Sequence, residues 1–446
     1  MALSNWKYYR DFTISISKIT EGVTNLVFPL YLTSTAGISD KDLTSIFTDL
    51  QGNYKRIAVT FHSNNENTQC YCEVHPNEWD YQNNRGVIWV NPGAEISATG
   101  DAVFRLYYDG THADNTSYIF DSGTTSAQTN VWDTKTWGAF LMADTPAGSG
   151  SIIDSAGYDH PGTPVGGMGA SNLVDCDIGG KALDFPGYQS GQYIDCGINW
   201  STLTDGFQAD ILAKFEDIAS TNIGGIFSFS KLDGNISQFG INAGNNNLEF
   251  EVNSNKTFYA PFTDALSWHA VSYQYDDSTD YASWIIDGVK KVDLWGAIFS
   301  FTDFKTLIGA YYDSDRTFGG KIAHVRFGHQ RTDAWRMILN DALLDNLGTW
   351  GDEQSGIVLR YAYSGKTTLF GGTPVGRKVL LIKRTPDSEE ILSRTNSDPA
   401  TGNFEFRYRP EANADGNELV ALGIDDDAGD DYNDVAVRLG PGILEV

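Results

Sequence analysis

Short segments in which apolar and polar residues alternate run from residue 180 to residue 327 and are separated by turn residues. Alternation with a period of two is typical of strands that bury one face. One turn is the dipeptide Asp287-Gly288, which follows Trp284-Ile285-Ile286 and favours a two-residue hairpin. The pattern predicts an antiparallel β-sandwich in the middle of the chain. The strand-like segments are residues 180–185, 193–194, 207–211, 224–228, 268–273, 284–286, 308–310 and 318–327.

The order of these segments resembles the laminin-G-like, concanavalin-type jelly roll family. The resemblance begins at Gly180-Lys181-Ala182-Leu183-Asp184-Phe185 and ends at Lys321-Ile322-Ala323-His324-Val325-Arg326-Phe327. It implies a jelly-roll domain over residues 119–350. Domains of this family commonly bind glycans or other surfaces and commonly lack a catalytic apparatus, so we expect binding rather than catalysis from this part of the chain.

Residues 1–118 are predicted to form a β domain of their own. Phe12 and Ile14 alternate with polar neighbours, and the strand-like Val87-Ile88-Trp89-Val90 is followed by the turn residues Asn91-Pro92-Gly93. With Trp6-Lys7-Tyr8-Tyr9-Arg10, this order resembles a family of uncharacterised β domains that stand immediately upstream of laminin-G-like sandwiches. Residues 33–53 depart from it. The resemblance supports both domains and carries over no catalytic motif.

Residues 355–446 are predicted to form a third β domain. Lys378-Val379-Leu380-Leu381-Ile382-Lys383 and Phe404-Glu405-Phe406-Arg407-Tyr408-Arg409 have the composition and alternation of strands. With the turn Thr401-Gly402-Asn403-Phe404, the arrangement resembles small transthyretin-like or carboxypeptidase-regulatory-like domains, which are frequent in tail and fibre proteins of bacteriophages. The fold class expected for the whole chain is therefore all-β, with a central jelly-roll sandwich between two further β domains.

A single amphipathic helix is predicted directly after the central sandwich. Apolar residues recur there at the spacing of one helix face, and Thr332 or Asp333 is available as the N-cap. We expect this helix to pack on the edge of the sandwich or over the seam to the next domain, with partner binding as the alternative. The apolar positions are Trp335, Ile338, Leu339, Ala342 and Leu343.

Composition limits the partners and the cellular setting. The formal net charge of −27 disfavours nucleic acid as a partner, because an acidic surface repels the phosphate backbone. Apolar runs stay well short of the roughly 18 residues that a membrane-spanning helix needs, so membrane insertion is not expected. The amino terminus lacks the apolar stretch of a signal peptide, so synthesis in a cytoplasm is expected.

The four cysteines are too few for a disulfide scaffold. Cys70 and Cys72 are two residues apart, which places them on one face of a strand, and a structural role is favoured over a metal site because only His75 stands nearby as a further ligand. Whether Cys176 and Cys196 pair is left open, because spacing alone does not decide it.

The sharpest chemical feature is an acidic segment at residues 425–434, with six Asp and one Asn in ten residues. Oxygen ligands on a glycine-containing turn suit Ca²⁺, which takes roughly six to eight of them. The segment also resembles the calcium loop of fucose-type lectins, although EF-hand spacing fails. The alternative is a solvated hairpin tip. The candidate Ca²⁺ ligands are Asp425, Asp427, Asp430, Asp431, Asn433 and Asp434.

A binding face for sugar is predicted at one rim of the central sandwich. Tyr311 and Tyr312 offer rings for stacking, and Asp313 and Asp315 offer acceptors for hydroxyl groups. Ordinary surface aromatics at a hairpin tip are the alternative.

Catalytic motifs are not evident, so the protein is expected not to be an enzyme. Glu249-Phe250-Glu251 comes closest to the acidic strand motif of sandwich-fold glycanases, but it lacks the middle Asp and the third acid. An exposed strand face is the favoured interpretation of that segment. His269 and His324 fall within predicted strands, and we expect both to be structural histidines with satisfied hydrogen bonds.

These features together favour an adhesion protein of a bacteriophage particle: a tail fibre, baseplate appendage or head decoration that binds host-surface glycans. The expected location is the virion, beside other virion proteins, in an oligomer or in many copies, so that weak sites act together. Two alternatives stay open. One is a purely structural virion component without glycan binding, and the other is a glycan-degrading virion enzyme.

Overall fold

A computed structural model divides the chain into two compact units, Met1–Gln354 and Ser355–Val446. For the second unit it describes the backbone of the strands. The described residues are 3, 6–63, 66–158, 160–197, 206–216, 224–231, 238–244, 247–252, 256–262, 266–276, 279, 281–294, 304–311, 316–355, 360–366, 378–384, 389–396, 403–408, 418–424, 435–438 and 443–445. In this part of the chain no helix is long and apolar enough to span a membrane.

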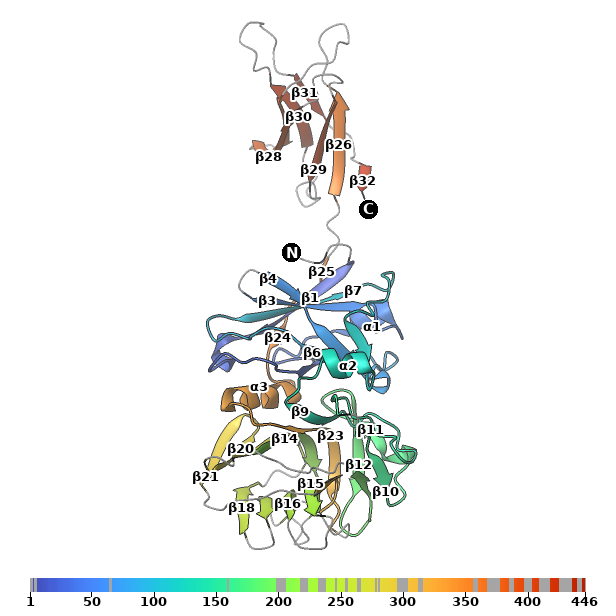
Figure 1. Cartoon of the computed structure of the whole chain (residues 1–446). Coiled ribbons are helices and arrows are strands. Elements are labelled where there is room, and N and C mark those ends of the chain that lie inside the picture. Colours follow the sequence, from blue (N-terminus) through green and yellow to red (C-terminus); the bar gives the residue numbers. More distant parts are fainter. Residues whose placement is uncertain are drawn as a thin grey trace. The chain divides into compact units, whose positions relative to one another are not determined.

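The amino-terminal part of the first unit is a sandwich of two sheets (Figure 1). One sheet has the order β24-β1-β7-β3-β4, with β25 also paired to β1, and the other has the order β2-β6-β5-β8. Phe28 and Phe104 face each other between the sheets, with ring centroids 5.2 Å apart. The strands are β1 (Tyr8–Ile14), β2 (Phe28–Leu32), β3 (Ile57–Ser63), β4 (Glu66–Gln69), β5 (Tyr71–Val74), β6 (Gly86–Asn91), β7 (Ala102–Tyr108), β8 (Ile119–Asp121), β24 (Thr349–Trp350) and β25 (Gln354–Ser355).

This amino-terminal sandwich takes strands from beyond residue 118. β8 pairs in parallel with β5, and β24 pairs with β1 after the chain has passed through the central sandwich. Short helical segments connect the strands: η1 (Ile16–Lys18), α1 (Thr44–Leu50), η2 (Pro76–Glu78) and α2 (Thr125–Asn130).

The central part of the first unit is a second sandwich. A seven-stranded sheet has the order β10-β13-β22-β15-β16-β17-β18, and an eight-stranded sheet has the order β11-β12-β23-β14-β19-β20-β21 with β9 also paired to β23. The strands are β9 (Thr136–Phe140), β10 (Thr163–Val165), β11 (Leu173–Asp175), β12 (Lys181–Pro186), β13 (Tyr193–Asp195), β14 (Phe207–Phe215), β15 (Gly224–Lys231), β16 (Gln238–Gly244), β17 (Asn247–Val252), β18 (Lys256–Pro261), β19 (Trp268–Asp276), β20 (Tyr281–Ile286), β21 (Val289–Leu294), β22 (Phe304–Ile308) and β23 (Gly319–Gly328); η3 (Ala170–Asn172) precedes β11.

Alternation along the strands fills the interior of this central sandwich. Ile211 and Ala213 of β14 point into a core that also contains the buried rings of Trp284 and Tyr273, whereas Leu212 points to the opposite face. The predicted hairpin joins β20 to β21, and both Asp287 and Gly288 have the positive φ of a type I′ turn, at 51° and 74°. The all-β fold class predicted from the sequence is confirmed.

Helix α3 (Asp333–Leu343) lies between the two sandwiches and confirms the predicted helix (Figure 1). It begins at Thr332, whose side chain accepts a hydrogen bond from the backbone N–H of Trp335. Asn340 donates to Ser272 Oγ of β19 at 2.7 Å, and on the other side the Tyr31 hydroxyl of β2 donates to the carbonyl of Leu343 at 3.1 Å. The helix therefore connects both sandwiches.

One continuous apolar core runs from the amino-terminal sandwich through α3 to the outer face of the eight-stranded sheet. It contains Phe28, Ile338 of the helix and the outward-facing Leu212 and Ala270 of β14 and β19. Burial of this surface stabilises the contact by roughly 25 cal/mol for each Å² of apolar area. The two sandwiches consequently form one structural unit.

The second unit contains two antiparallel sheets, with orders β29-β26-β32 and β28-β27-β30-β31. The strands predicted around residues 378–383 and 404–409 are present as β27 and β29. The strands are β26 (Arg360–Lys366), β27 (Lys378–Arg384), β28 (Glu389–Asn396), β29 (Asn403–Tyr408), β30 (Glu418–Ile424), β31 (Val435–Arg438) and β32 (Ile443–Glu445).

Candidate functional site

The predicted sugar-binding rim does not have the geometry expected of it at Tyr311. This side chain is fully buried, and the guanidinium carbon of Arg316 lies 5.2 Å from the centroid of its ring. The backbone N–H of Tyr311 bonds to the carbonyl of Arg316, which closes the base of the loop. Tyr311 thus offers no face for stacking. Tyr312, Asp313 and Asp315 lie outside the described residues.

The predicted calcium ligands also lie outside the described residues, since all of them fall within 425–434. Among the residues that are described, no group of three or more His, Cys, Asp or Glu side chains could hold a metal ion. The calcium site stays a prediction. Glu249 and Glu251 lie on β17, where the description extends to the backbone.

The outer face of the eight-stranded sheet is occupied by the protein itself. The indole of Trp335 lies 4.5 Å from the guanidinium carbon of Arg326 and 5.0 Å from that of Arg331, and Arg331 forms an ion pair with Asp133 at 2.6 Å. Trp335 and Arg326 are each 2 % exposed. This face therefore serves packing within the unit and is closed to an external ligand.

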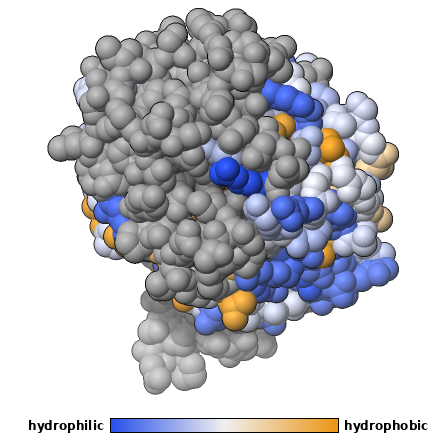
Figure 2. Space-filling view, turned by 90° about the horizontal axis from the view of Figure 1, so that it is seen from below, coloured by the Kyte–Doolittle hydropathy of each residue, from blue (hydrophilic) through white to orange (hydrophobic). Residues whose placement is uncertain are grey.

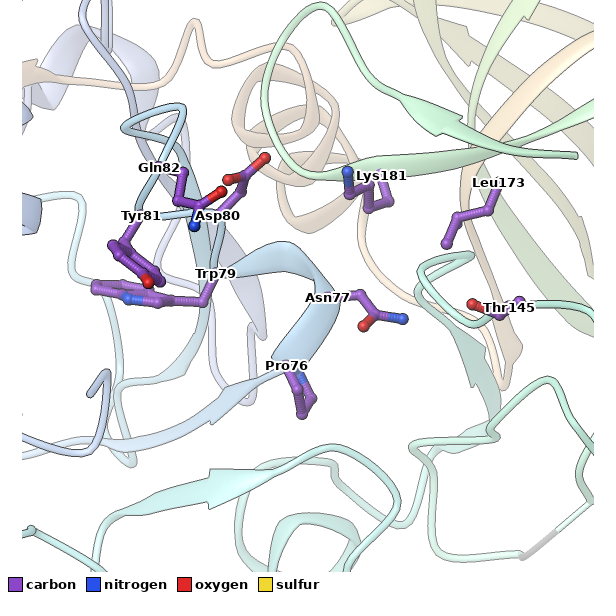
Figure 3. A pocket seen from close by; sticks show the side chains of 9 residues that line it. All are labelled: Pro76, Asn77, Trp79, Asp80, Tyr81, Gln82, Thr145, Leu173 and Lys181. Atoms are coloured by element: carbon purple, nitrogen blue, oxygen red, sulfur yellow. The ribbon is translucent and has the colours of Figure 1, made fainter. Parts of the chain in front are cut away.

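A pocket of about 330 Å³ opens at the seam between the two sandwiches (Figure 3). One wall comes from η2 and the turn after it, and the other from Thr145 and the first residues of β11 and β12. The lining residues are Pro76, Asn77, Trp79, Asp80, Tyr81, Gln82, Thr145, Leu173 and Lys181.

Local sequence fixes the floor of this pocket. Pro76 suits the first position of η2, and His75 caps it by accepting a hydrogen bond from the N–H of Asn77 at 3.2 Å. Trp79 follows directly, and its indole N–H donates to the carbonyl of Gln51 at 2.7 Å. A Cβ at Gly86 would lie 2.9 Å from the Trp79 ring, so a glycine is needed for the ring to lie flat against β6.

A tight turn presents the polar side chains of the same wall. The backbones of Asp80 and Arg85 bond to each other in both directions, and the Asp80 carboxylate accepts hydrogen bonds from the backbone and side-chain N–H groups of Asn83. Tyr81 and Gln82 stand at the tip of this turn, and Tyr81 is 41 % exposed. The turn thus holds an aromatic ring at the mouth of the pocket.

The opposite wall is held by two ion pairs, one within it and one across the seam. Asp175 and Lys181 occupy directly opposed positions of β11 and β12, with Nζ 2.6 Å from Oδ1. The other oxygen of Asp175 lies 3.2 Å from Nη1 of Arg85, on the far side of the seam. Burial alone would raise the pKa of Asp80, but the hydrogen bonds from Asn83 and the charges of Lys181 and Arg85 lower it below its ordinary value.

Several polar groups in the pocket are available to a ligand. The hydroxyls of Tyr81 and Thr145 and the amide of Gln82 make no side-chain hydrogen bond within the described ranges, whereas the Asn77 amide donates to the carbonyl of Ala143 at 2.9 Å. The pocket can therefore hold a small polar molecule by ring stacking and by hydrogen bonds. The sequence predictions missed it because its walls come from segments about a hundred residues apart, and we find no local signal that would have revealed it.

Behind this wall lies a buried polar cluster that was also missed. Glu73 accepts hydrogen bonds of 2.5 Å from the Trp132 indole and from the Ser155 hydroxyl. Burial raises the pKa of Glu78 to about 8, with His75 opposing the rise, and burial likewise raises the pKa of Asp154 to about 7. These groups do not line the pocket. Their role is to stabilise the contact between the two sandwiches.

The described residues that are visible in the view from below form a mostly hydrophilic surface (Figure 2). Hydrophobic residues in this view are scattered singly rather than gathered, which is normal for a protein surface. Within the visible described part, this face gives no sign of a wide apolar interface.

No family model matches this chain, and no curated protein matches it. Among solved structures, domain 4 of the arabinanase AbnA from Geobacillus stearothermophilus, in complex with arabinotriose, is 19% identical, covers 46% of this chain and 98% of its own, and has a TM-score of 0.35. The CBM40 of the Ruminococcus gnavus IT-sialidase, bound to α2,3-sialyllactose, is 15% identical, covers 30% of this chain and 83% of its own, and has a TM-score of 0.27. The receptor-binding domain of botulinum neurotoxin type G is 17% identical, covers 69% and 79%, and has a TM-score of 0.34. Likeness at this level identifies neither a ligand nor an activity for this chain.

Proposed function

We propose that this chain is an adhesion protein of a bacteriophage particle and that it binds a host-surface glycan in the pocket at the seam. The observation that carries the proposal is the exposed ring of Tyr81 at the mouth of a 330 Å³ pocket lined by free hydroxyl and amide groups. A sugar ring has an apolar face that stacks on an aromatic ring and an edge of hydroxyls that bond to such groups.

The size of the pocket supports a small part of a glycan as the ligand. Its volume is near the lower end of the range for ligand sites, roughly 300 to 1,000 Å³, so one or two sugar rings would fit. We expect a single site to be weak. Display in an oligomer or in many copies, beside other virion proteins, would raise the avidity by roughly 10²-fold or more without new contacts.

The assignment to a virion is supported by the sequence rather than by the pocket. Three β domains in tandem, the last of a kind that is frequent in phage tail and fibre proteins, an acidic composition and only four cysteines agree with a protein that is made in a host cytoplasm and then displayed on a particle. The proposed role involves binding without a chemical step.

A glycan array tests the proposal. The purified full chain is applied to host-surface glycans beside two variants, Tyr81→Ala and a matched control, Tyr188→Ala, since Tyr188 is a similarly exposed tyrosine (36 %) that does not line the pocket. We expect Tyr81→Ala to weaken binding about tenfold or more, which corresponds to loss of one stacked ring, and Tyr188→Ala to leave it unchanged.

Three results would contradict the proposal. Failure to bind any glycan would favour a purely structural virion component. Binding that tolerates Tyr81→Ala would place the site elsewhere. Release of reducing ends from host polysaccharide, lost in Glu249→Gln or Glu251→Gln, would favour a glycan-degrading enzyme.

A further inference from the structure

We propose that the pocket at the seam selects uncharged sugar residues and rejects sugar acids such as uronic or sialic acids. The inference deepens the proposed glycan binding and rests on it. The charges around the pocket carry it: the one cationic side chain among the described lining residues is already paired with a carboxylate, and the one carboxylate among them adds a negative charge of its own.

The cation is Lys181, and it has a partner on its own hairpin. Its Nζ lies 2.6 Å from Oδ1 of Asp175, directly across the β11–β12 pair, so strand register holds the two together. The side chain of Lys181 is only 21% exposed, which limits its freedom to turn toward a ligand. A sugar carboxylate that approached Lys181 would therefore also meet the negative charge of Asp175.

The nearest other cation is held in the same way. Arg85 Nη1 lies 3.2 Å from Oδ2 of Asp175, so one carboxylate is shared between the two cations. Asp175 bridges the turn of the amino-terminal sandwich and the hairpin of the central sandwich. The three groups together carry a charge of +1, and the nearby carboxylate of Asp80, which interacts with both cations, balances it.

The lining carboxylate acts against an anionic ligand. Asp80 is oriented by two hydrogen bonds from Asn83, at 3.2 Å to Oδ1 and 2.7 Å to Oδ2, and each oxygen has a further lone pair that can accept from a sugar hydroxyl. The same oxygens would repel a carboxylate. The net charge of −27 adds a weaker, long-range repulsion that salt would screen.

Glu78 does not change this balance. It is the residue between Asn77 and Trp79, but it is 4 % exposed, does not line the pocket and has its carboxylate beside Gly180. The charges that a ligand meets are therefore those of Asp80, Asp175, Lys181 and Arg85, two of each sign. Hydroxyl and amide groups are the better partners for such a site than a carboxylate.

Matched ligands test the selection directly. Galactose with galacturonate, glucose with glucuronate, and lactose with sialyllactose are titrated at low salt into the full chain, and binding is followed by ligand NMR. We expect the neutral member of at least one pair to bind about tenfold better than its acidic partner, and Tyr81→Ala to abolish that binding.

Asp175→Asn is the decisive variant. It leaves the shape of the hairpin in place, since the Asp175 side chain is 48% exposed, but it releases both Lys181 and Arg85. We expect affinity for the acidic member to rise about tenfold while affinity for the neutral member stays the same. Thermal unfolding of the variant, unchanged within a few degrees, shows that the fold is intact.

The outcomes separate the two proposals. Binding that depends on Tyr81 but prefers the acidic sugars would overturn the selection of neutral sugars and leave glycan binding standing, and so would an Asp175→Asn variant with an unchanged preference. If no sugar binds in a manner that depends on Tyr81, glycan binding at this pocket fails, and the selection fails with it.

Discussion

His75 and Asp144 form a buried contact, with Nε2 of the imidazole 2.9 Å from Oδ1 of the carboxylate. His75 caps η2 of the amino-terminal sandwich, whereas Asp144 follows β9 in the segment that enters the central sandwich. Asp144 also accepts a 2.7 Å hydrogen bond from the N–H of Ile153. The contact therefore fixes the connecting segment against the turn that forms one wall of the pocket.

Stability of the first unit is predicted to fall as the pH rises from about 5 to about 8. Burial raises the pKa of Glu78 to about 8 and that of Asp154 to about 7. Burial opposes protonation of His75, but Asp144 and the nearby carboxylates raise its pKa overall. In this pH range the unfolded chain releases protons that the folded chain retains, so each such group lowers the free energy of unfolding by up to about 1.4 kcal/mol per pH unit.

Thermal unfolding at constant ionic strength between pH 5.5 and pH 8.5 measures this slope. Glu78→Gln provides the control, because a neutral amide cannot ionise, and it should flatten the slope up to about pH 8. An unfolding temperature that increases with pH across this range would contradict the prediction.

Gly309→Ala is predicted to destabilise the central sandwich by about 2 to 4 kcal/mol. Gly309 has φ of 79°, and a Cβ there would collide with the ring of Phe185. The matched control is Gly191→Ala, where φ is 68° but no atom lies within 4 Å of the added Cβ; it should cost only about 1 kcal/mol. Urea unfolding measures the loss of stability in both variants. Equal losses would show that backbone strain at positive φ, and not the collision with Phe185, accounts for the effect at Gly309.

Asn340 and Ser272 are predicted to be energetically coupled. The Asn340 amide donates to Ser272 Oγ at 2.7 Å, and the Ser272 hydroxyl in turn donates to the buried Asp210. Asn340→Ala should destabilise the protein by about 1 to 3 kcal/mol, because it leaves buried polar groups unpaired. A double-mutant cycle with Ser272→Ala should give a coupling energy above about 0.5 kcal/mol, whereas strictly additive losses would mean that the bond contributes nothing.

A chain that ends at Gln354 is predicted to fold and to keep its sugar-binding properties, because residues 1–354 form a compact unit with its own cores. A chain that ends at residue 348 is the control. It lacks β24, whose Trp350 packs on Phe12 with ring centroids 5.0 Å apart, and should lose about 3 to 5 kcal/mol. Circular dichroism and thermal unfolding distinguish the two, and equal stability would contradict a structural role for β24.

Calcium is predicted to stabilise the second unit through the acidic residues 425–434. A ligand that binds only the folded state at 100 times its dissociation constant adds about 2.7 kcal/mol to stability. Calorimetric titration of the full chain with Ca²⁺, and unfolding in Ca²⁺ or in EDTA, test this. Asp430→Asn combined with Asp431→Asn should abolish the effect, while absence of any heat or shift in the unmodified chain would support a solvated tip.

The parts of the fold with a local period could be predicted from the sequence. The turn at Asp287-Gly288 needs only its own dipeptide to adopt positive φ, and α3 follows from apolar residues at helix spacing. The position of the helix was predicted less well: it covers the seam to the preceding amino-terminal sandwich rather than the seam to the next domain. An amphipathic helix must bury its apolar face, but its local period does not reveal against which neighbour.

The binding site could not be predicted in this way, because exposure is decided by tertiary packing. Tyr311 stands beside turn residues and resembles a surface aromatic, yet it is buried and contacts Arg316. His324 was expected to have satisfied hydrogen bonds, but neither ring nitrogen has a partner among the described residues. Instead its ring stacks on Trp89 at 4.6 Å, and burial lowers its pKa to about 3 and keeps it neutral.

The four cysteines illustrate the same limit. Cys176 and Cys196 are free, and they lie in different cores, one beside the amino-terminal sandwich and the other inside the central sandwich. Burial raises the pKa of both thiols. Spacing in the sequence did not reveal which core each would join.

Helix α3 covers the outer face of the eight-stranded sheet, and this limits how the chain can be divided into independent parts. If the central sandwich were expressed or transferred without the helix, the apolar side chains of Leu212 and Ala270 would become exposed to solvent. Arg326 would also lose its contact with the indole of Trp335. The isolated central sandwich would therefore be unstable and prone to aggregate. Transfer of the central sandwich to another protein would therefore have to include the whole compact unit, residues 1–354.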